Sequence, residues 1–331
     1  MKAAVTTGRN DHNIVEIREI DIPKPGPNDI LVKVMAAAAN PTDWKTSTIW
    51  YPKEGNVLGC DYAGIIEAYG SSPNGAQAEY VVAPSVGALL IPDSWSFEEA
   101  SQLSAGSFTA CQMLYYALPL PMPSFSTSTS TPNPQPQTDV LIWGGSSSVG
   151  QAAVQLAHLS GLRVISTSSP RNFSLVKSLG ADIVLPHSDP ETISKIRALT
   201  GNKLKYALDT ISEGSTPQQV ADCIGDEGGV VSTALLYDSP RKDVEVRFVL
   251  AGMLMGIDLE VPFVRKADPE QHEFAKKASK LLTELLAKGL YKPGRIRVMP
   301  KGLASVNEGL ELLRDGKVSG EKIVYRISDT P

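Results

Sequence analysis

A cluster of glycine and serine residues at positions 144–150 has the residue types of a phosphate-binding turn. Gly144 and Gly145 allow a tight turn, and Gly150 lets a new helix pack closely on the preceding strand. The free amides of that helix and the hydroxyls of residues 146–148 are suited to a pyrophosphate. An ordinary strand-to-helix connection is the alternative interpretation. The flanking apolar strand and amphipathic helix favour a dinucleotide site.

The residues after the next expected strand, 163–167, indicate which dinucleotide binds. An NAD enzyme places a carboxylate there against the ribose 2′-hydroxyl, whereas this chain has Ser168, Ser169, Pro170, Arg171 and Asn172. Without an acid to repel a 2′-phosphate, and with Arg171 able to bind one, NADPH is favoured over NADH. These residues also suit a plain helix start, with Ser169 as N-cap and Pro170 in the first turn. The two interpretations are compatible.

The elements that position this turn alternate between strand and helix. Strands are expected near Val164, Ile183, Ala207 and Val230, separated by helices at 171–179, 191–199 and 216–224. Such alternation predicts an α/β unit, a Rossmann doubly wound parallel sheet with helices on both faces.

The rest of the chain predicts a second, β-rich domain. Short apolar runs with prolines and glycines fill residues 1–117, and a helix at about 268–288 and a last unit at 303–327 are expected to return to it. We therefore assign residues 1–117 and 266–331 to one domain and 138–265 to the Rossmann domain. Residues 118–137 are rich in Pro, Ser and Thr and predict a low-complexity insertion.

Composition excludes several classes of function. The 331 residues carry a net charge of −5 without a long basic run, which disfavours nucleic acid as a partner. No apolar stretch approaches the roughly 20 residues of a membrane span, and the first residues resemble a strand rather than a secretory signal, so a cytoplasmic location is expected. Cys60, Cys111 and Cys223 are far apart and odd in number, which argues against a disulfide framework or structural zinc site.

Motifs along nearly the whole chain resemble one superfamily. They are KAAV, PKPGPNDILVKV, NPTDWK, LGCDYAG, NGAQAEYV, IWGGSSSVG, SLGAD, YALDTIS, GGVVSTAL and GKVSGEKIVYRI. As a set they resemble medium-chain dehydrogenase/reductases of the zinc-free quinone and enoyl reductase branch, and within it the fungal trans-acting enoyl reductases of polyketide assembly. The resemblance implies a GroES-like catalytic domain beside the Rossmann domain.

The resemblance implies that this chain binds no catalytic metal. Zinc-dependent members have Cys-x-x-Asp where this chain has Asn40 to Asp43, and Gly-His-Glu where it has Gly59, Cys60 and Asp61. Asn40, Cys60 and Asp61 would be a poor zinc set. Hydrogen-bond donors must then polarise the substrate carbonyl, which suits reduction of an activated double bond.

Two candidate proton donors follow from the same resemblance. The segment Thr42, Asp43, Trp44 and Lys45 corresponds to one that lines the nicotinamide, and Lys45 is a candidate donor to the developing enolate. Tyr51 has the spacing at which related mitochondrial enoyl thioester reductases carry a proton-donating tyrosine. A surface lysine and an interfacial aromatic are the alternatives.

Substrate-contacting residues are also implied by resemblance. One stretch passes between substrate and nicotinamide, with Thr109 as its most characteristic and candidate catalytic residue; it comprises Ser104, Ala105, Gly106, Ser107, Phe108, Thr109, Ala110 and Cys111. Its alternative is a core helix packed by Leu103, Phe108 and Leu114. Met255, Gly256 and Ile257 belong to a segment, 253–259, expected to line the acyl pocket or to form an edge strand buried in a dimer.

The resemblance also assigns cofactor contacts. Ser146, Ser147, Ser148 and Val149 correspond to the pyrophosphate site, and Ser169, Pro170, Arg171 and Asn172 to the 2′-phosphate site. His187 corresponds to an adenine-contacting position, and Val318 and Ser319 to a C-terminal segment that returns to the cofactor. A loop histidine and a plain turn are the respective alternatives.

One segment departs from the family pattern. Where members continue through a further strand and a glycine-rich loop, this chain runs from Ser72 directly to Pro73 and Asn74. Loss of a strand predicts exposed sheet edges, and with them low stability or a changed pocket.

Together these observations predict an NADPH-dependent enoyl reductase that acts on an α,β-unsaturated acyl thioester presented by a polyketide synthase carrier domain. A quinone or enone oxidoreductase is the alternative enzyme, and an inactive NADP-binding scaffold is the alternative outside catalysis. The sequence leaves monomer and homodimer open.

Overall fold

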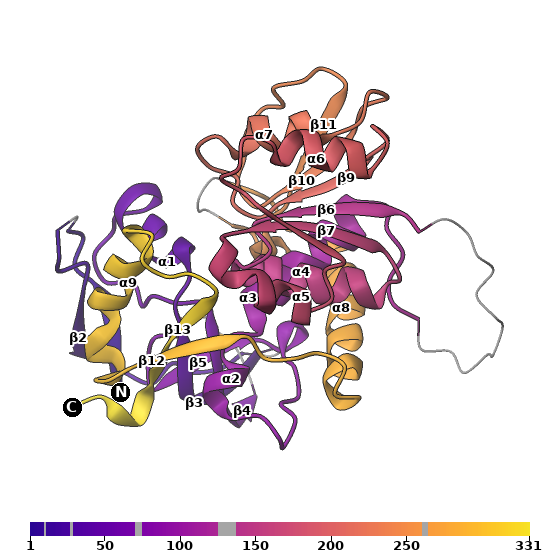
Figure 1. The fold of residues 1–331 in the computed structure, drawn as a ribbon. Helices are drawn as coiled ribbons and strands as arrows, with labels where there is room; N and C mark the ends of the chain where they lie inside the picture. The colour runs from indigo at the N-terminus through magenta and orange to yellow at the C-terminus, as the bar shows by residue number, and fades with distance from the viewer. Residues whose placement is uncertain (10, 27–28, 70–74, 125–136, 260–263) are drawn as a thin grey trace. The chain divides into compact units, whose positions relative to one another are not determined.

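The structure is a computed structural model that describes residues 1–9, 11–26, 29–69, 75–124, 137–259 and 264–331. The chain divides into two compact units, one formed by residues 1–105 and 252–331 and the other by residues 106–251 (Figure 1). The predicted insertion at 118–137 falls mostly outside the described residues, as does the predicted shortening at residues 72–74. The domain boundaries expected from the sequence stay predictions.

The second unit is built on a parallel sheet. Its strands are β6 (Asp139–Trp143), β7 (Arg163–Ser168), β8 (Ile183–Pro186), β9 (Tyr206–Asp209), β10 (Gly229–Thr233) and β11 (Val244–Phe248). Its helical elements are η3 (Gln112–Ala117), α4 (Ser148–Leu159), η4 (Pro170–Asn172), α5 (Phe173–Ser178), α6 (Thr192–Leu199) and α7 (Thr216–Cys223). The strand order β11-β10-β9-β6-β7-β8 is that of a Rossmann sheet, so the predicted fold class is confirmed.

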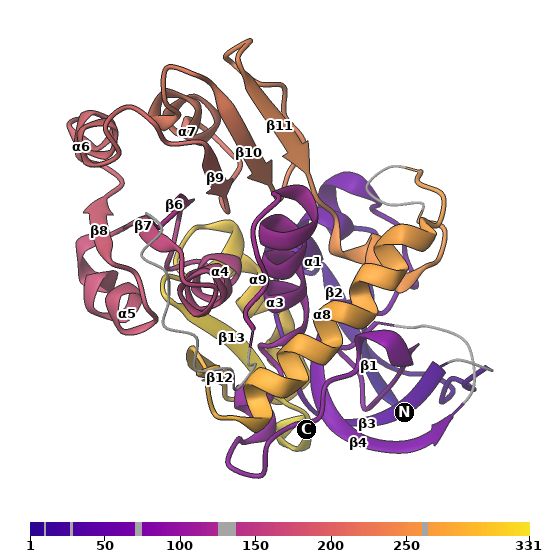
Figure 2. The same cartoon turned by 90° about the vertical axis from the view of Figure 1, so that its right-hand side faces the viewer.

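Helices cover both faces of this sheet, with α4 and α5 on one side and α6 and α7 on the other (Figure 2). A core of Leu141, Ile165, Ile196, Ala207 and Val231 holds the sheet against one helical layer. Strands buried on both faces read as continuous apolar runs, which is why β6 was recognisable from the sequence.

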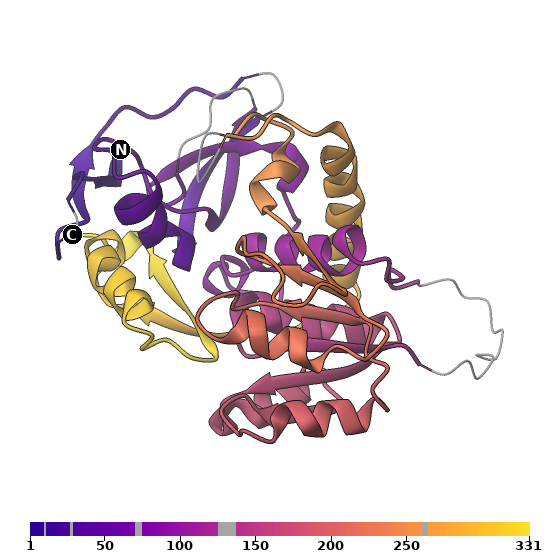
Figure 3. The same cartoon turned by 90° about the horizontal axis from the view of Figure 1, so that it is seen from above.

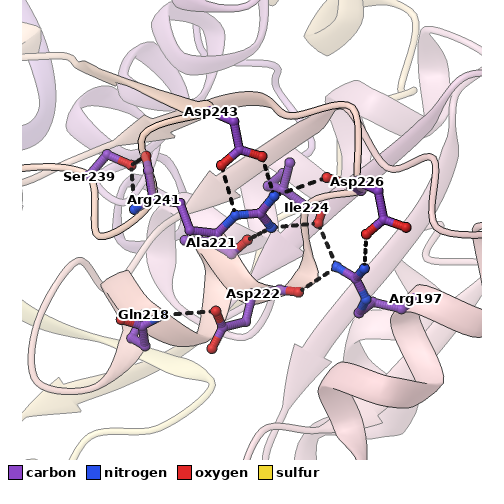
Figure 4. Close-up of polar contacts among 10 residues, drawn as sticks. Arg197, Gln218, Ala221, Asp222, Ile224, Asp226, Ser239, Arg241 and Asp243 are labelled. Carbon is purple, nitrogen blue, oxygen red and sulfur yellow. Dashed lines mark hydrogen bonds and ion pairs between the residues drawn. The ribbon is translucent and has the colours of Figure 1, made fainter.

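Two arginines hold the end of α7 (Figure 4). Arg241 Nη1 donates to the carbonyls of Ala221 at 2.9 Å and Ile224 at 2.8 Å, and Arg197 Nη1 donates to the carbonyl of Ile224 at 2.8 Å. Each guanidinium also pairs with a carboxylate, Arg197 with Asp226 and Arg241 with Asp243. Positive charge at a helix C-terminus satisfies carbonyls that lack intrahelical partners.

The first unit is a mixed β structure. Its strands are β1 (Lys2–Thr6), β2 (Val15–Glu19), β3 (Asp29–Ala38), β4 (Asp61–Tyr69), β5 (Tyr80–Pro84), β12 (Arg295–Met299) and β13 (Glu321–Arg326). Its helical elements are α1 (Pro41–Lys45), η1 (Thr46–Trp50), η2 (Ser85–Gly87), α2 (Phe97–Ala100), α8 (Pro269–Ala287), η6 (Gly302–Ser305), α9 (Val306–Arg314) and η7 (Ile327–Asp329). The division between the units falls within α3 (Ser104–Cys111) and η5 (Ala251–Met255).

Strand β3 is the centre of this unit. It pairs with β4 along one edge and with β13 and β5 along the other. Ile30, Val32 and Val34 alternate inward to a core that also contains Leu310 of α9 and Tyr325 of β13. The two ends of the chain lie side by side (Figure 3), where Lys2 Nζ binds the carbonyl of Pro331.

Helix α8 begins where the sequence predicted. The Asp268 carboxylate accepts hydrogen bonds from the amides of Glu270 and Gln271, and Pro269 occupies the first helical position. This is the arrangement expected of a helix N-terminus, and the predicted helix at about 268–288 is confirmed.

Candidate active site

The first part of the candidate site is the turn between β6 and α4 in the second unit. Gly144 has a φ of +86°, which favours glycine. A Cβ on Gly145 would lie 2.1 Å from Ser166 Oγ, and one on Gly150 would lie 2.2 Å from the carbonyl oxygen of Gly144. The turn therefore has no room for side chains at these positions, and its bare backbone fits a pyrophosphate.

Ser147 fixes the start of α4. Its Oγ accepts a hydrogen bond from the amide of Gly150 at 2.9 Å and also bonds the hydroxyl of Thr210 at 2.9 Å. Ser147 is thus the N-cap of α4, and its hydroxyl is engaged within the protein. Ser146 and Ser148 are half-buried, so the helix N-terminus keeps hydroxyls beside its free amides.

The contact of Ser147 with Thr210 lies where the strand order reverses. β6 has β7 on one side and β9 on the other, and ligands of open parallel sheets bind at the carboxyl ends of strands at such a point. Thr210 directly follows β9. Sequence reasoning missed this residue, although its place after a predicted parallel strand was the available signal.

Asp209 makes the loop after β9 rigid. Its carboxylate accepts hydrogen bonds from the amides of Ile211 at 3.1 Å and Ser212 at 2.8 Å, and from the hydroxyls of Thr216 at 2.8 Å and Tyr237 at 3.2 Å. Burial raises the pKa of Asp209, while these donors oppose that rise. Thr210 is therefore held firmly beside the turn.

The structure brings Ser169 and His187 together. Ser169 Oγ lies 3.2 Å from His187 Nε2 after the neighbouring strands β7 and β8. The predicted helix start is confirmed, since Ser169 precedes η4 and Pro170 is its first residue, although the Ser169 side chain caps no amide. Arg171 is exposed and forms no ion pair with any described residue, whereas Asn172 is buried.

The predicted substrate stretch forms α3, so its helical interpretation is confirmed. A Cβ on Gly106 would lie 2.8 Å from Ser148 Oγ, which shows that this helix passes beside the first residue of α4. Phe108 and Leu114 are buried, as a core helix requires, while Thr109 is half-exposed. The stretch thus packs as core and still leaves Thr109 accessible.

The second part of the candidate site is the segment at residues 40–51 of the first unit. Asn40 precedes α1, and its amide donates to the Asp43 carboxylate at 2.8 Å. Lys45 is buried, with its Nζ 5.6 Å from the centre of the Trp44 ring, so the surface-lysine alternative is wrong. Tyr51 follows η1 and is half-buried, with Lys53 Nζ 5.8 Å from its ring centre.

Trp44 has a buried donor without a partner among the described residues, and Asp43 is a buried carboxyl group with a raised pKa. The indole Nε1 of Trp44 is buried without a hydrogen-bond partner among the described residues, so it is a donor left unsatisfied within the protein. Burial raises the pKa of Asp43 to about 7, opposed by its hydrogen bond from Asn40. Gln77 Nε2 also donates to Asp43, at 3.3 Å.

The buried ammonium of Lys322 lies beside Asn40, Cys60 and Asp61, which belong to the two segments that differ from the zinc-dependent motifs. Lys322 Nζ lies 2.8 Å from Asp61 Oδ2 and also bonds Asn40 Oδ1. Asn40 Nδ2 donates to Asp61 at 2.8 Å and contacts Cys60 Sγ at 3.3 Å. Burial raises the pKa of the Cys60 thiol, which keeps it protonated and a poor ligand.

These residues do not fit a zinc ion. The oxygens of Asn40 and Asp61 already bind an ammonium, and a second cation there would face strong repulsion. Elsewhere in the part of the chain that the structure describes, no group of three or more His, Cys, Asp or Glu side chains is arranged to hold a metal. Sequence reasoning missed Lys322.

The remaining predicted residues lie in the first unit. The edge-strand alternative for residues 253–259 is wrong, because η5 is a 3-10 helix that includes Met255. Met255 and Ile257 are exposed, and Gly256 has a φ of +71°. Val318 packs against the core of the first unit in the turn before β13, with Ser319 beside it.

Two family models match the chain. Residues 26–115 match the alcohol dehydrogenase GroES-like domain, and residues 148–283 match the zinc-binding dehydrogenase domain.

No helix among the described residues is long and apolar enough to cross a membrane.

Curated relatives match over nearly the full chain. A trans-enoyl reductase of Alternaria alternata is 36% identical over 337 residues, covering 95% of this chain and 96% of the relative. A trans-enoyl reductase of Aspergillus clavatus is 35% identical, covering 92% of this chain and 91% of the relative.

Solved structures share the fold. The quinone oxidoreductase of Pseudomonas syringae aligns with a TM-score of 0.76 at 20% identity, covering 98% of this chain and 100% of its own. The CurK enoyl reductase aligns with a TM-score of 0.74 at 18% identity, covering 98% of each chain.

The β-rich unit with its GroES-like match, the Rossmann sheet and the glycine turn define the class of medium-chain dehydrogenase/reductases. Within that class, the chain belongs to the trans-enoyl reductase family. The predicted resemblance is confirmed, and the protein is an oxidoreductase that uses a nicotinamide cofactor.

Proposed function

We propose that this protein is an NADPH-dependent, trans-acting enoyl reductase that reduces an α,β-unsaturated acyl thioester on a polyketide synthase carrier domain. The single observation that carries the proposal is the buried ammonium of Lys322, bonded to Asn40 and Asp61 beside α1. The Lys322 ammonium already occupies the oxygens of Asn40 and Asp61, so these residues do not accommodate a metal ion. Hydrogen-bond donors must then polarise the thioester carbonyl. The names of the curated relatives agree with this chemistry.

The cofactor-binding residues follow from the second unit. The turn at residues 144–150 would hold the pyrophosphate on the N-terminus of α4. Arg171, exposed and unpaired among the described residues, would bind the 2′-phosphate, with Ser169, Pro170 and Asn172 around it. His187, bonded to Ser169, would contact the adenine. For Trp44, Val318 and Ser319 of the first unit, a contact with the nicotinamide stays what the family resemblance implies.

The catalytic roles fall on three side chains. A nicotinamide held by the second unit would supply a hydride for the β-carbon. Lys45 donates a hydrogen bond to the thioester oxygen as enolate charge develops there, and Tyr51 protonates the α-carbon. Thr109 positions the thioester, and Met255, Gly256 and Ile257 contact the acyl chain.

The partner in this proposal is the acyl thioester carried by the synthase, with the protein acting as a monomer or homodimer. All three cysteines are free, and Cys111 and Cys223 are buried. Free thiols favour a reducing compartment, so the cytoplasm is the proposed location.

Absorbance of the reduced nicotinamide tests the function. With NADPH and a crotonyl thioester, we expect consumption of the nucleotide and appearance of the butyryl thioester. Consumption with a simple quinone alone would instead favour a quinone oxidoreductase. Binding of NADPH without consumption with either substrate would contradict the proposed activity and favour a scaffold.

Single substitutions test the donor roles. Lys45→Met and Tyr51→Phe should each lower kcat by about 100-fold, the usual contribution of a positioned acid. The Kd for NADPH, measured by fluorescence, should stay within about twofold. Lys53→Met is the matched control, because Lys53 is exposed near Tyr51 and has no proposed role. An unchanged kcat would remove that residue from the mechanism.

A further inference from the structure

Asp61, the first residue of β4, connects three separate segments of the first unit. Its Oδ1 accepts a hydrogen bond from the amide of Ala105 at 2.6 Å, in the first turn of α3. Its Oδ2 accepts from the side chains of Asn40 and Lys322, each at 2.8 Å. One fully buried carboxylate thus touches the start of α1, the start of α3 and the last strand, β13.

Asn40 is held in one orientation by this arrangement. Its Oδ1 accepts from Lys322 while its Nδ2 donates to Asp61, so both ends of the amide have charged partners. Its backbone amide donates to Asp43 at 2.8 Å. Rotation of the amide by 180° would put a donor against the ammonium, so the side chain of Asn40, the residue before α1, is fixed in one orientation.

Lys322 is the charge that makes the arrangement possible. The side chains of Lys322 and Asp61 are 7% and 0% exposed. An unpaired carboxylate at that depth is strongly unfavourable, whereas a paired and hydrogen-bonded one is tolerated. Without the ammonium, the Asp61 carboxylate would be buried without its charged partner, which weakens the arrangement that it forms with Asn40 and Ala105.

We propose that Lys322 is a positioning residue whose ammonium, through Asp61 and Asn40, holds the start of α1, and with it Lys45, in place relative to Ala105 of the same unit. This inference rests on the proposed function, in which Lys45 acts on the thioester. Lys322 itself touches no reacting atom. Its effect passes through Asp61 and Asn40.

The variants Lys322→Met, Asp61→Asn and the double variant test the proposal. Removing one partner of a buried ion pair is destabilising, whereas the double variant replaces both charges and should recover stability. The side-chain amide introduced by Asp61→Asn can still accept from Ala105, so the double variant keeps that contact while it removes both charges and the hydrogen bonds that they give Asn40. Leu285→Ala is the matched control, since it removes a buried apolar side chain of another element, α8, and destabilises the protein without changing any polar group of the cluster.

Three quantities are measured on the full chain. Stability is measured by the urea midpoint. Function is measured by the kcat and KM for crotonyl thioester and by the NADPH Kd. Local order is measured by hydrogen exchange at the amides of residues 43–45 and 105. We expect kcat to fall about tenfold or more in the double variant, with the NADPH Kd within about twofold. Exchange at those amides should be faster than in wild type, and unchanged in Leu285→Ala.

A double variant with wild-type kcat and wild-type exchange would overturn the proposal, because the pair would then serve stability alone. An equal loss of kcat in Leu285→Ala at matched urea midpoint would overturn it as well. If wild-type protein consumes no NADPH with the thioester, the proposed function fails. The exchange measurement still tests the positioning role in that case.

Discussion

Arg171 carries the proposed choice of NADPH over NADH. Arg171→Glu removes the guanidinium and adds a charge that repels a 2′-phosphate, so the Kd for NADPH should rise by about 10- to 100-fold. The Kd for NADH should change by less than about threefold. Fluorescence titration with both nucleotides measures this. Lys177→Glu, exposed on α5, is the charge-matched control. Equal weakening of both nucleotides would contradict the assignment.

Asp43 gives stability a distinctive pH dependence. Its pKa is about 7 in the folded protein against an ordinary 3.8, so the folded state binds the proton more tightly than the unfolded state does. Stability from this group is therefore fully present below pH 4 and declines as pH rises to 7. Asp43→Asn should remove the decline, worth about 2–4 kcal/mol.

The difference between two unfolding profiles isolates this effect. The urea unfolding free energy of Asp43→Asn minus that of wild type should increase between pH 4 and pH 7 and level off above pH 7. Subtraction removes carboxylates such as Asp189 and Asp243, whose pKa values are lowered by hydrogen bonds from Lys195 and Arg241. If the unfolding free energies of Asp43→Asn and wild type ran parallel with pH, Asp43 would ionise as readily in the folded protein as in the unfolded one.

At the scale of elements, the connection from β6 to α4 depends on the close approach of two backbones. Alanine normally stabilises a helix by about 1 kcal/mol over glycine. At position 150, however, its Cβ would meet the carbonyl oxygen of Gly144 at 2.2 Å, so α4 must move away from the turn. Gly150→Ala should therefore weaken NADPH binding by about tenfold or more and lower the melting temperature.

Gly87→Ala is the control for this change, because a Cβ there would meet no atom within 4 Å. Its melting temperature, measured by calorimetry, and its Kd for NADPH, measured by titration, should both stay near the wild-type values. If Gly150→Ala bound NADPH with the wild-type Kd, the turn would adapt to the added Cβ. The close approach of Gly150 to Gly144 would then not be required for cofactor binding.

At the scale of the whole molecule, β4 is an exposed edge. It is the terminal strand of its sheet within the described residues, and Ile65 and Ile66 are 51% and 45% exposed. Unpaired apolar edges favour association between chains. Ile65→Thr with Ile66→Lys should therefore reduce self-association at high concentration, as light scattering would show.

The same double variant should keep its kcat and its melting temperature, because exposed substitutions change stability by about 0.5 kcal/mol or less. Unchanged association across a concentration series would show that β4 is not a contact surface between copies.

The sequence by itself determined the second unit and its turn. Strand runs, helix periods and glycine positions are local signals, so β6, α4, the helix start at Ser169 and the helix α8 were predicted close to their observed places. The family resemblance selected residues 40–51 and α3 as functional segments. It could not show that Lys45 is buried.

Only the tertiary structure decided the polar cluster. Lys322 is 282 residues from Asn40 and 261 from Asp61, and Ser147 is 63 from Thr210. A lysine in a late strand carries no local signal of burial, because long-range packing decides which carboxylate it meets. Its place is set by β13 pairing with β3, whose last residues lead directly into Asn40.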